Sequence, residues 1–407
     1  MPADEPKRPI SPFRGGRRAA LDALARVDPG RYARTRNYLG GDVTRLSPYL
    51  RHGVLSMAEV RDAARHAGDA AKLLNELAWR DYFRRIYDRI GDGVWDDLEP
   101  SKAGLEPSDY ADEMPADVVE GATGLACIDA FSRDLADIGY LHNHARMWLA
   151  AYLVHWRRVA WPAGAEWFLY HLLDGDPASN NLSWQWVAGT FSNKPYIFNR
   201  ENLERHTDGV YCRRCPLRGR CDFEGSYEDL GARLFADAGS TAGGARSTDL
   251  DGPTPNAPLP RPAGVGPAIV WVHADDLNPA GPSLAANPGA PALFVWDEPA
   301  LVASPWGPGR ITFIEECLAE LPVTVRRGDP AAIVPAFAAE HGARRVALTY
   351  SPDPRMKWLA KGFAATLTVE VIQPEPFVDL RREPDLGRFS RYWKSAEKAL
   401  MARPRRG

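Results

Sequence analysis

Hydrophobic side chains recur every three to four residues through the first part of the chain, which is the spacing of one face of an α-helix. Residues 125–138 follow this spacing, Gly139 ends their helix, and a further helix begins within 141–156. In residues 70–87 the same spacing sets on one face Leu73, Glu76, Trp79, Arg80 and Phe83. We therefore expect the chain to be helical from about residue 17 to residue 235.

The pattern changes in the last third of the chain, where short runs rich in β-branched and aromatic residues alternate with helical stretches. The helical stretches include residues 310–321 and 329–343. The β-rich runs are 268–272, 292–297, 323–328, 345–350 and 367–372. Strands that alternate with helices predict a parallel sheet with covering helices. Because the region has no GxGxxG motif, dinucleotide binding is not indicated.

The two patterns are separated by residues 237–267, which are rich in Gly, Pro, Ala and Ser and almost lack large apolar side chains. Such a segment buries too little surface to order itself, so we expect a flexible linker. The predicted fold is multi-domain, with an all-α domain over 1–236 and a Rossmann-like α/β domain over 268–380. Residues 381–407 are expected to form a C-terminal helix and a basic tail, whose charges are a solvated face.

The composition is that of an ordinary globular protein: 407 residues, 45% hydrophobic and 25% charged, with a formal net charge of −3. There is no apolar run of about 18 residues, and the first thirty residues lack the apolar stretch of a signal peptide. We therefore expect a cytoplasmic chain with no membrane partner. The net charge does not exclude nucleic-acid binding, which depends on a local basic patch.

Three of the five cysteines, Cys212, Cys215 and Cys221, fall within ten residues. In a reducing compartment this clustering favours a metal over disulfides. A tetrahedral metal ion or an iron–sulfur cluster needs a fourth ligand, and the spacing alone does not separate zinc from iron–sulfur. Cys317 lies in an apolar helical stretch and is expected to be a core residue.

The run "LLDGDPASNNLSWQW", residues 172–186, is the most unusual stretch of the chain. Its Asp, Gly, Pro, Ser and Asn residues are typical of a surface turn. Large aromatic side chains, however, usually pack on the protein or stack on a ligand, so the tryptophans indicate a site. Asn180 and Asn181 donate and accept hydrogen bonds, which suits a heterocycle whose ring nitrogen changes protonation with redox state.

Two other clusters accompany this run. Arg146 shares a helical face with Asn143 and Met147, and a buried pair between Arg146 and Asp174 would bridge two segments, either at a site or as a structural salt bridge. In "GDVTRLSPYLRHG", hydroxyl groups and an arginine precede Pro48 at the expected start of a helix. Such a start can bind an anion such as phosphate, although Ser-Pro is more often a plain N-cap.

Five segments occur in the order and spacing of the FAD-binding helical domain of the DNA photolyase/cryptochrome family, which the chain resembles over about residues 13–223. These segments are "GGDVTRLSPYLRHGVLS", "NELAWRDYF", "TGLACIDA", "GYLHNHARMWLAAYL" and "LLDGDPASNNLSWQW". The resemblance implies that the run of residues 172–186 closes around a folded FAD. It assigns the flavin contacts to Asp174, Gly175, Asp176, Asn180, Asn181, Arg80 and Arg146, and the diphosphate contacts to Tyr32, Thr44, Arg45, Leu46 and Ser47.

The resemblance also implies a pocket for a DNA lesion. Residue types that the family uses for cyclobutane pyrimidine dimers stand at Glu76, Trp79, Asn143, Met147 and Trp186, whereas enzymes for the (6-4) photoproduct typically carry a histidine in place of Asn143. The implied protein is a deoxyribodipyrimidine photolyase, which uses blue light and reduced FAD to repair a flipped-out dimer in damaged DNA. The alternative is a cryptochrome-type blue-light photoreceptor without repair activity.

The family photoreduces its flavin through a relay of tryptophans. Trp184 and Trp161 match the two inner members of the relay. The outer member has no equivalent, because the region near Ser108 and Tyr110 contains no tryptophan. Tyr110 or another route must then serve, or photoreduction is slow.

Two further features follow from the resemblance. Cys127 in "TGLACIDA" would be the fourth ligand of a [4Fe–4S] cluster, as in bacterial iron–sulfur members of the family, with zinc as the alternative. The α/β domain resembles the family's antenna domain, which usually precedes the helical domain but here follows it, so the order is permuted. No motif identifies an antenna pigment, and a monomer is expected.

Overall fold

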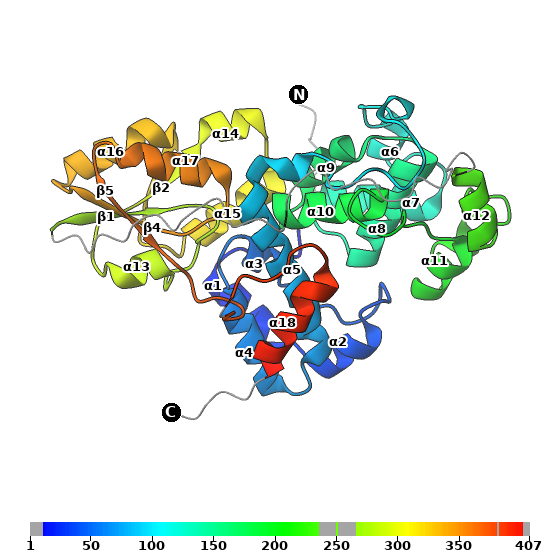
Figure 1. Ribbon diagram of the computed structural model, residues 1–407, viewed down its shortest axis with the longest axis horizontal. Helices are drawn as coiled ribbons and strands as arrows, with labels where there is room; N and C mark the ends of the chain where they lie inside the picture. The colour runs from blue at the N-terminus through cyan, green and yellow to red at the C-terminus, as the bar shows by residue number, and fades with distance from the viewer. Residues whose placement is uncertain (1–10, 236–249, 251–265, 381, 402–407) are drawn as a thin grey trace, which may run out of the picture.

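The computed structural model describes residues 11–235, 250, 266–380 and 382–401, which form a helical part and a sheet part (Figure 1). This architecture confirms the predicted fold class of a helical domain and a parallel-sheet α/β domain. The predicted linker over 237–267 lies outside the described residues except for 250, 266 and 267. Among the described residues, no helix has both the length and the hydropathy that crossing a membrane requires.

The helical part carries the long central helix α5 (Ala71–Ile90), which is buried on almost every side rather than along one stripe. Its other α-helices are α1 (Arg17–Ala25), α2 (Pro29–Thr35), α3 (Ser47–Arg51), α4 (Met57–Ala67), α6 (Ala116–Val119), α7 (Ala126–Ile138), α8 (Asn143–Ala151), α9 (Trp161–His171), α10 (Pro177–Ala188), α11 (Arg200–His206) and α12 (Tyr227–Leu234). Short 3-10 turns are η1 (Gly91–Trp95), η2 (Pro107–Asp109) and η4 (Cys212–Arg214), and η3 (Tyr152–Trp156) is a π-turn.

Local sequence signals explain where α4 begins and where α7 ends. Ser56 and Glu59 form a reciprocal capping box that starts α4. Gly139 ends α7, as predicted, with a φ of 71°, a left-handed conformation that glycine adopts without strain.

Five parallel strands form one sheet in the order β3-β2-β1-β4-β5, which is a doubly wound topology. The strands are β1 (Ala268–Val272), β2 (Ala292–Asp297), β3 (Thr324–Gly328), β4 (Arg345–Thr349) and β5 (Thr368–Ile372). Val270 of the central strand β1 pairs with Ala292 of β2 and with Ala347 of β4. All five strands lie within a residue of their predicted bounds, because short apolar runs between turn residues suit buried parallel strands.

The two faces of the sheet belong to different cores. The helices of the sheet part are α13 (Pro282–Ala286), α14 (Glu298–Ala303), α15 (Pro308–Leu318), α16 (Pro330–Glu340) and α17 (Pro354–Phe363), and α16 and α17 lie on the opposite face from α13 (Figure 1). Ile269 and Trp271 of β1 pack in a core with α16 and α17. Val270 and Val272 point the other way, into a core that includes α5. One face of the sheet therefore shares a hydrophobic core with α5 of the helical part, while the other face packs on helices of the sheet part.

Polar contacts seal the same junction at the carboxyl ends of β1 and β4, where the strand order reverses and open α/β sheets commonly bind ligands. Arg51 of α3 forms a buried ion pair with Asp275, whose other oxygen accepts a hydrogen bond from Ser351 at 2.5 Å. A Cβ at Gly53 would lie 2.0 Å from the carbonyl oxygen of Asp275, so only glycine allows this approach. The helical part thus occupies this end of the sheet.

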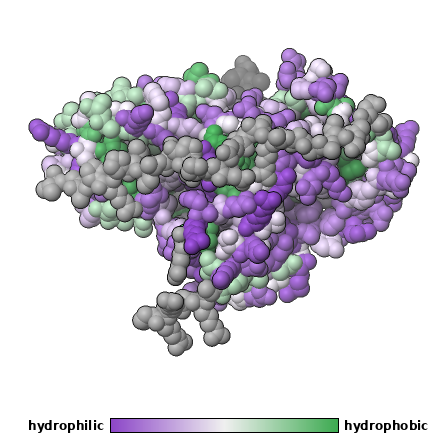
Figure 2. Space-filling view, viewed as in Figure 1, coloured by the Kyte–Doolittle hydropathy of each residue, from purple (hydrophilic) through white to green (hydrophobic). Residues whose placement is uncertain are grey.

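The chain ends in α18 (Phe389–Met401), which returns from the sheet part and packs beside α5 (Figure 1). Tyr392 and Ala396 on its inner face are fully buried. Its charged side chains Arg391, Lys394 and Lys398 are exposed, as the prediction of a solvated face requires. The visible surface of the helical part is largely hydrophilic (Figure 2).

Candidate functional site

The acidic run, which we define as residues 172–176 between α9 and α10, is buried between α5, α8 and α10. Asp174 and Asp176 are only 6% and 5% exposed. The predicted pair between Arg146 and Asp174 is present: Nη2 of Arg146 donates to the two carboxylate oxygens at 3.0 and 2.9 Å. Nε of Arg146 donates to the carbonyl oxygen of Leu141 at 2.9 Å, which fixes the guanidinium plane. The pair therefore bridges α8 to the acidic run.

Asp176 begins α10 as its N-cap and accepts hydrogen bonds from the amide of Ala178 at 3.3 Å and the hydroxyl of Ser179 at 2.9 Å. Nη2 of Arg80 lies 3.3 Å from the carboxylate. Burial disfavours the charged carboxylate, but the cationic Arg80 and Arg51 hold the pKa of Asp176 below its usual value. Asp176 is therefore ionised at neutral pH, and the site keeps a fixed negative charge.

Among the described residues, the buried donors of this region without a hydrogen-bond partner include Nε of Arg80 and Nδ2 of Asn181, while Nη2 of Arg80 has only its ion pair with Asp176. An unsatisfied buried donor costs roughly 1–3 kcal/mol, so such atoms usually face a ligand or ordered water. The neighbouring Asn180 is oriented by hydrogen bonds from its Nδ2 to the carbonyl of Ala165 at 3.0 Å and to Oδ1 of Asn181 at 3.1 Å. These amides and Arg80 suit a polar, planar ligand.

The sheet part closes the acidic run from behind. A Cβ at Gly175 would lie 2.9 Å from Nη1 of Arg310 in α15, so glycine allows the guanidinium to approach the backbone of this run. Arg310 is 2% exposed and lies over the ring of Trp306 at 4.1 Å. Sequence analysis missed Arg310, because nothing in the local pattern of α15 marks a residue that contacts a run more than one hundred positions earlier.

The predicted diphosphate residues lie on α2 and at the start of α3. The interpretation of Ser47 as a plain N-cap is wrong, because the N-cap of α3 is Leu46 and no side chain caps this helix. Arg45 just before it is exposed and has a left-handed φ of 53°. Tyr32 on α2 accepts a hydrogen bond from Nε of Arg36 at 3.2 Å. The first amides of α3 are therefore left for another partner.

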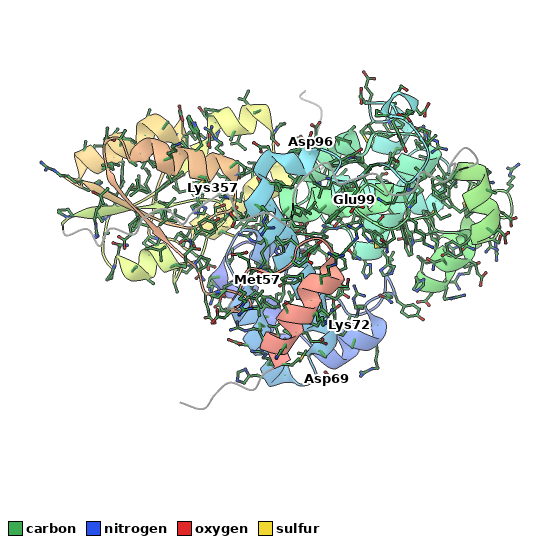
Figure 3. The ribbon with its side chains drawn as sticks, in the orientation of Figure 1. Met57, Asp69, Lys72, Asp96, Glu99 and Lys357 are labelled. Carbon is green, nitrogen blue, oxygen red and sulfur yellow. The ribbon has the colours of Figure 1, made fainter. Side chains whose placement is uncertain are left out.

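Glu76 and Trp79 lie one turn apart on α5, but each already has protein contacts. The carboxylate of Glu76 pairs with Arg36 at 2.8 Å and with Lys72 at 2.7 Å. Lys72, near the start of α5, is labelled in Figure 3. The half-buried indole of Trp79 stacks on Phe389 of α18. Sequence analysis named neither Arg36 nor Phe389, since both come from other elements.

The remaining predicted lesion-pocket residues lie on α8 and α10. The exposed Asn143 donates from Nδ2 to the sulfur of Met147 at 3.4 Å, so these two residues form one patch on α8. The half-buried Trp186 packs against Tyr196 with ring centroids 5.4 Å apart. Within the described part of the chain, the rings of Trp79 and Trp186 do not touch each other.

The four cysteines outside the sheet part border one small cavity with a volume of about 20 Å³. Cys127 comes from α7, Cys212 and Cys215 flank the η4 turn, and Cys221 follows it. Burial, reinforced by Glu204, raises the pKa of Cys212 to about 11. Among the described residues, no three His, Cys, Asp or Glu side chains are arranged to hold a metal ion. Cys317 is a buried core residue, as predicted.

Residues 73–214 match the model of the FAD binding domain of DNA photolyase. This segment, residues 73–214, is therefore similar to the FAD-binding domain of DNA photolyase, and we call it the photolyase segment. The photolyase segment runs from α5 to the η4 turn and so includes the acidic run, Arg146 and the first predicted cysteines.

Curated photolyases and cryptochromes are similar to the same region. The chain is 44% identical over 155 residues to a deoxyribodipyrimidine photo-lyase of Streptomyces griseus, covering 37% of this chain and 33% of that protein. It is 37% identical over 168 residues to a chloroplastic/mitochondrial cryptochrome DASH of Solanum lycopersicum, covering 39% and 29%. A crystal structure of a class III photolyase from Agrobacterium tumefaciens aligns at 25% identity and a TM-score of 0.46 over 55% of each chain. This chain thus spans about a third of the length of the two curated relatives.

The residues of the photolyase segment fit the FAD that this domain binds. The unpaired donors of Arg80 and Asn181 and the oriented amide of Asn180 suit the polar edge of a flavin. Outside that segment, α3 has no side-chain cap, which leaves its first amides available to a diphosphate. The roles of the individual residues stay predictions.

The predicted relay tryptophans Trp184 and Trp161 have a neighbour, Trp95, that was not predicted from the sequence. The buried indole of Trp184 lies against Gly164 of α9, where a Cβ would be 2.3 Å from the ring. Trp161, one turn earlier on α9, is stacked on Trp95 with ring centroids 6.4 Å apart and an interplanar angle of 12°. Nε1 of Trp161 donates to Asp97 at 2.7 Å. Trp95 was missed because it lies at the end of η1, before the positions where an outer tryptophan was sought.

Proposed function

We propose that this protein is a deoxyribodipyrimidine photolyase, which uses FAD and blue light to repair cyclobutane pyrimidine dimers in DNA. One observation supports the proposal: α5, α8 and α10 each carry a predicted lesion-pocket residue within two turns of a predicted flavin-site residue. Trp79 is followed by Arg80 on α5, and Asn143 precedes Arg146 on α8. On α10, Trp186 follows Asn181. A lesion and a flavin held by these helices would be close neighbours, as electron transfer requires.

Each chain residue has a defined task in this proposal. A dimer stacks poorly in the duplex, so flipping it out costs a few kcal/mol, less than flipping a normal base, and photolyases are among the base-flipping enzymes. Trp79 and Trp186 would stack on the flipped dimer. Asn143 would hydrogen-bond the base edges, and the carboxylate of Glu76, which Arg36 and Lys72 hold in place, would accept from a ring N–H. When bound and reduced, FAD supplies under light the electron that splits the cyclobutane ring and recovers it afterwards.

The test is dimer loss in an illuminated mixture of reduced protein and an oligonucleotide that contains one cyclobutane thymine dimer. We expect loss of the dimer in light but not in the dark. Variants Glu76→Ala and Trp79→Ala should repair much more slowly while retaining FAD, and the Trp358→Phe variant, changed at an exposed site in the sheet part, should repair normally. Wild-type repair no faster than that of the Glu76→Ala, Trp79→Ala double variant would refute the proposal and favour a cryptochrome-type photoreceptor.

We also propose that Cys127, Cys212, Cys215 and Cys221 hold a [4Fe–4S] cluster. The support is that all four thiols border one cavity, and Cys₄ ligation is typical of such clusters. Four cysteines can also bind a zinc ion, so zinc is the alternative and the metal content of the protein decides between the two. Iron and acid-labile sulfide should copurify anaerobically with the wild type and with Cys317→Ala, and should be lost in Cys212→Ala. Stoichiometric zinc without iron would refute the cluster.

The proposed partner is damaged DNA, and the proposed setting is the reducing cytoplasm, where free thiols persist. We propose that the protein acts as a monomer. Sedimentation of the protein with and without the dimer-containing oligonucleotide tests the DNA partner and the monomeric state, since a complex of one protein with one oligonucleotide is expected.

A further inference from the structure

The C-terminal helix α18 lies against the lesion side of α5, although it is outside the segment that matches the photolyase family. The ring of Phe389, at its first residue, is stacked on the indole of Trp79 with centroids 3.7 Å apart and an interplanar angle of 10°. The stack continues to Trp393, whose ring centroid lies 6.2 Å from that of Phe389 at an angle of 14°. One face of Trp79 is therefore covered by an aromatic ring from the other end of the chain.

The place of Phe389 is fixed by anchors on both sides. Before the helix, the carbonyl oxygen of Leu386 accepts a hydrogen bond from the hydroxyl of Tyr82 at 2.9 Å. The neighbouring Arg388 forms an ion pair with the buried Glu99, which is labelled in Figure 3. Within the helix, the hydroxyl of Tyr392 donates to Asp81 at 2.6 Å. The contacts with Tyr82 and Asp81 tie the start of α18 to the part of α5 that carries Trp79, and the pair with Glu99 ties it to the segment that follows η1.

A half-buried tryptophan on a helix has several rotamers, and freezing one of them on binding reduces affinity. A parallel ring that is held at stacking distance favours a single indole plane before the ligand arrives. On α5, Glu76 lies one turn before Trp79 and is itself held by Arg36 and Lys72. The two predicted lesion contacts of α5 are thus both braced by residues from outside their own turn.

We propose that α18 is a wall of the damaged-base site and that Phe389 is a positioning residue, which holds the Trp79 indole in the plane that a flipped base needs for stacking. The inference rests on the proposed repair function. The ligand in this inference is the flipped-out pyrimidine dimer. The dimer would stack on Trp79, and Phe389 would act on its binding only by holding the Trp79 indole.

The test compares Phe389→Ala and Phe389→Leu with Phe389→Tyr in the full-length, FAD-loaded protein. Binding of a labelled oligonucleotide containing one thymine dimer, and of the same sequence undamaged, is measured in the dark by fluorescence anisotropy. The Ala and Leu variants should lose about two- to tenfold of the preference for the dimer, the value of one aromatic pair. The Tyr variant, which keeps the ring, should restore it. Because Phe389→Leu keeps apolar bulk, it serves if Phe389→Ala does not fold.

The matched control is Leu400→Ala at the other end of α18. Leu400 is 3% exposed, so its truncation loosens the packing of the helix without touching Trp79. The preference for the dimer should be unchanged in this variant. The near-ultraviolet circular dichroism of Trp79, identified by its loss in Trp79→Phe, should be altered in Phe389→Ala and normal in Phe389→Tyr and Leu400→Ala.

The possible results separate this inference from the repair proposal. An unchanged preference in Phe389→Ala and Phe389→Leu, with a reduced one in Trp79→Ala, would overturn the inference alone. An equal loss in Leu400→Ala without recovery in Phe389→Tyr would also overturn it, since the role of Phe389 would then be merely structural. The circular dichroism measurement needs no DNA, so it decides the positioning of Trp79 even if the wild type shows no preference for the dimer, a result that would refute repair.

Discussion

The indole of Trp95 stacks on that of Trp161 and lies closer to the surface. Trp161 is 7% exposed and hydrogen-bonded to Asp97, whereas Trp95 is half-buried and flanked by the exposed Asp96 and Asp97. Trp184 lies beside Gly164, one turn further along α9. In the predicted relay, Trp95 would follow Trp184 and Trp161 as the outer member, and the carboxylate of Asp97 would stabilise positive charge on Trp161.

Replacing Trp95 should therefore block the last step of flavin photoreduction. In the proposed chain of transfers, an external thiolate loses one electron to the oxidised Trp95, and the flavin gains one electron through Trp184 and Trp161. The Trp95→Phe variant should lose most of the photoreduction of bound oxidised FAD by dithiothreitol, measured by flavin absorbance under blue light. Dimer repair after chemical reduction with dithionite should be unchanged, since repair does not use this path.

Two further variants decide whether Trp95 or Tyr110 is the outer member of the relay. Trp358→Phe removes an indole that is 60% exposed on the sheet part and should photoreduce normally. Tyr110→Phe tests the tyrosine that the sequence offered as a substitute for the outer member. Normal photoreduction in Trp95→Phe together with slow photoreduction in Tyr110→Phe would assign the outer position to Tyr110 instead.

The parts of the fold that depend on neighbouring residues were predictable from the sequence. The strands β1 and β2 have the predicted bounds, because each is a short apolar run between turn residues. The end of α7 at Gly139 and the pair of Arg146 with Asp174 also follow from local spacing and charge. Residues contributed from distant segments were not predictable: Arg310 behind Gly175 and Phe389 on Trp79 lie where chain topology, rather than local pattern, puts them.

Local rules also failed where tertiary structure decided the outcome. Ser-Pro predicted an N-cap at Ser47, yet α3 begins one residue earlier, because Leu46 is fully buried in the core and serves as the cap position. The outer tryptophan was sought near Ser108, whereas stacking on Trp161 requires only spatial proximity, which Trp95 reaches from the 3-10 turn that follows α5.

Removing the guanidinium of Arg146 should release FAD and destabilise the fold. In Arg146→Met the carboxylate of Asp174 stays buried without its cation, which costs about 3–5 kcal/mol of unfolding free energy. Urea unfolding and the flavin absorbance of the purified variant measure the two effects. The control is Arg205→Met, whose pair with Glu201 is exposed and should contribute about 0–1 kcal/mol. Equal losses in both variants would contradict this account of the acidic run.

A methyl group at Gly164 should displace the indole of Trp184. In Gly164→Ala the new Cβ would meet the ring at 2.3 Å, and such overpacking costs about 1–3 kcal/mol. The emission spectrum of the protein should change with the stability, because a fully buried indole moves. Gly231→Ala on α12 is the matched control, since no atom lies within 4 Å of its added methyl group and helical alanine is favoured by roughly 0.4–1 kcal/mol. A Gly164→Ala protein as stable as Gly231→Ala would contradict the packing of Trp184 on α9.

Stability should fall as the pH is lowered from about 6.5 to about 4, in part because of His155. Its ring is fully buried, with Nε2 3.0 Å from the carbonyl oxygen of Val187. Burial lowers the pKa of His155 to about 4, so the unfolded chain binds this proton at a higher pH than the folded chain does. The stabilisation from the neutral ring is complete above the unfolded pKa and is lost as the pH approaches 4, a change of about 3 kcal/mol.

The histidine contribution is measured by urea unfolding between pH 7 and pH 4.5 in the wild type, His155→Gln and His66→Gln. The slope of unfolding free energy against pH should be smaller by up to one proton in His155→Gln, because glutamine does not titrate. The exposed His66 on α4 should leave the slope unchanged when replaced. His142 and His144, whose pKa values burial also lowers to about 4, keep part of the slope in every variant. A slope in His155→Gln equal to that of the wild type would show that the His155 ring reaches solvent before the protein unfolds.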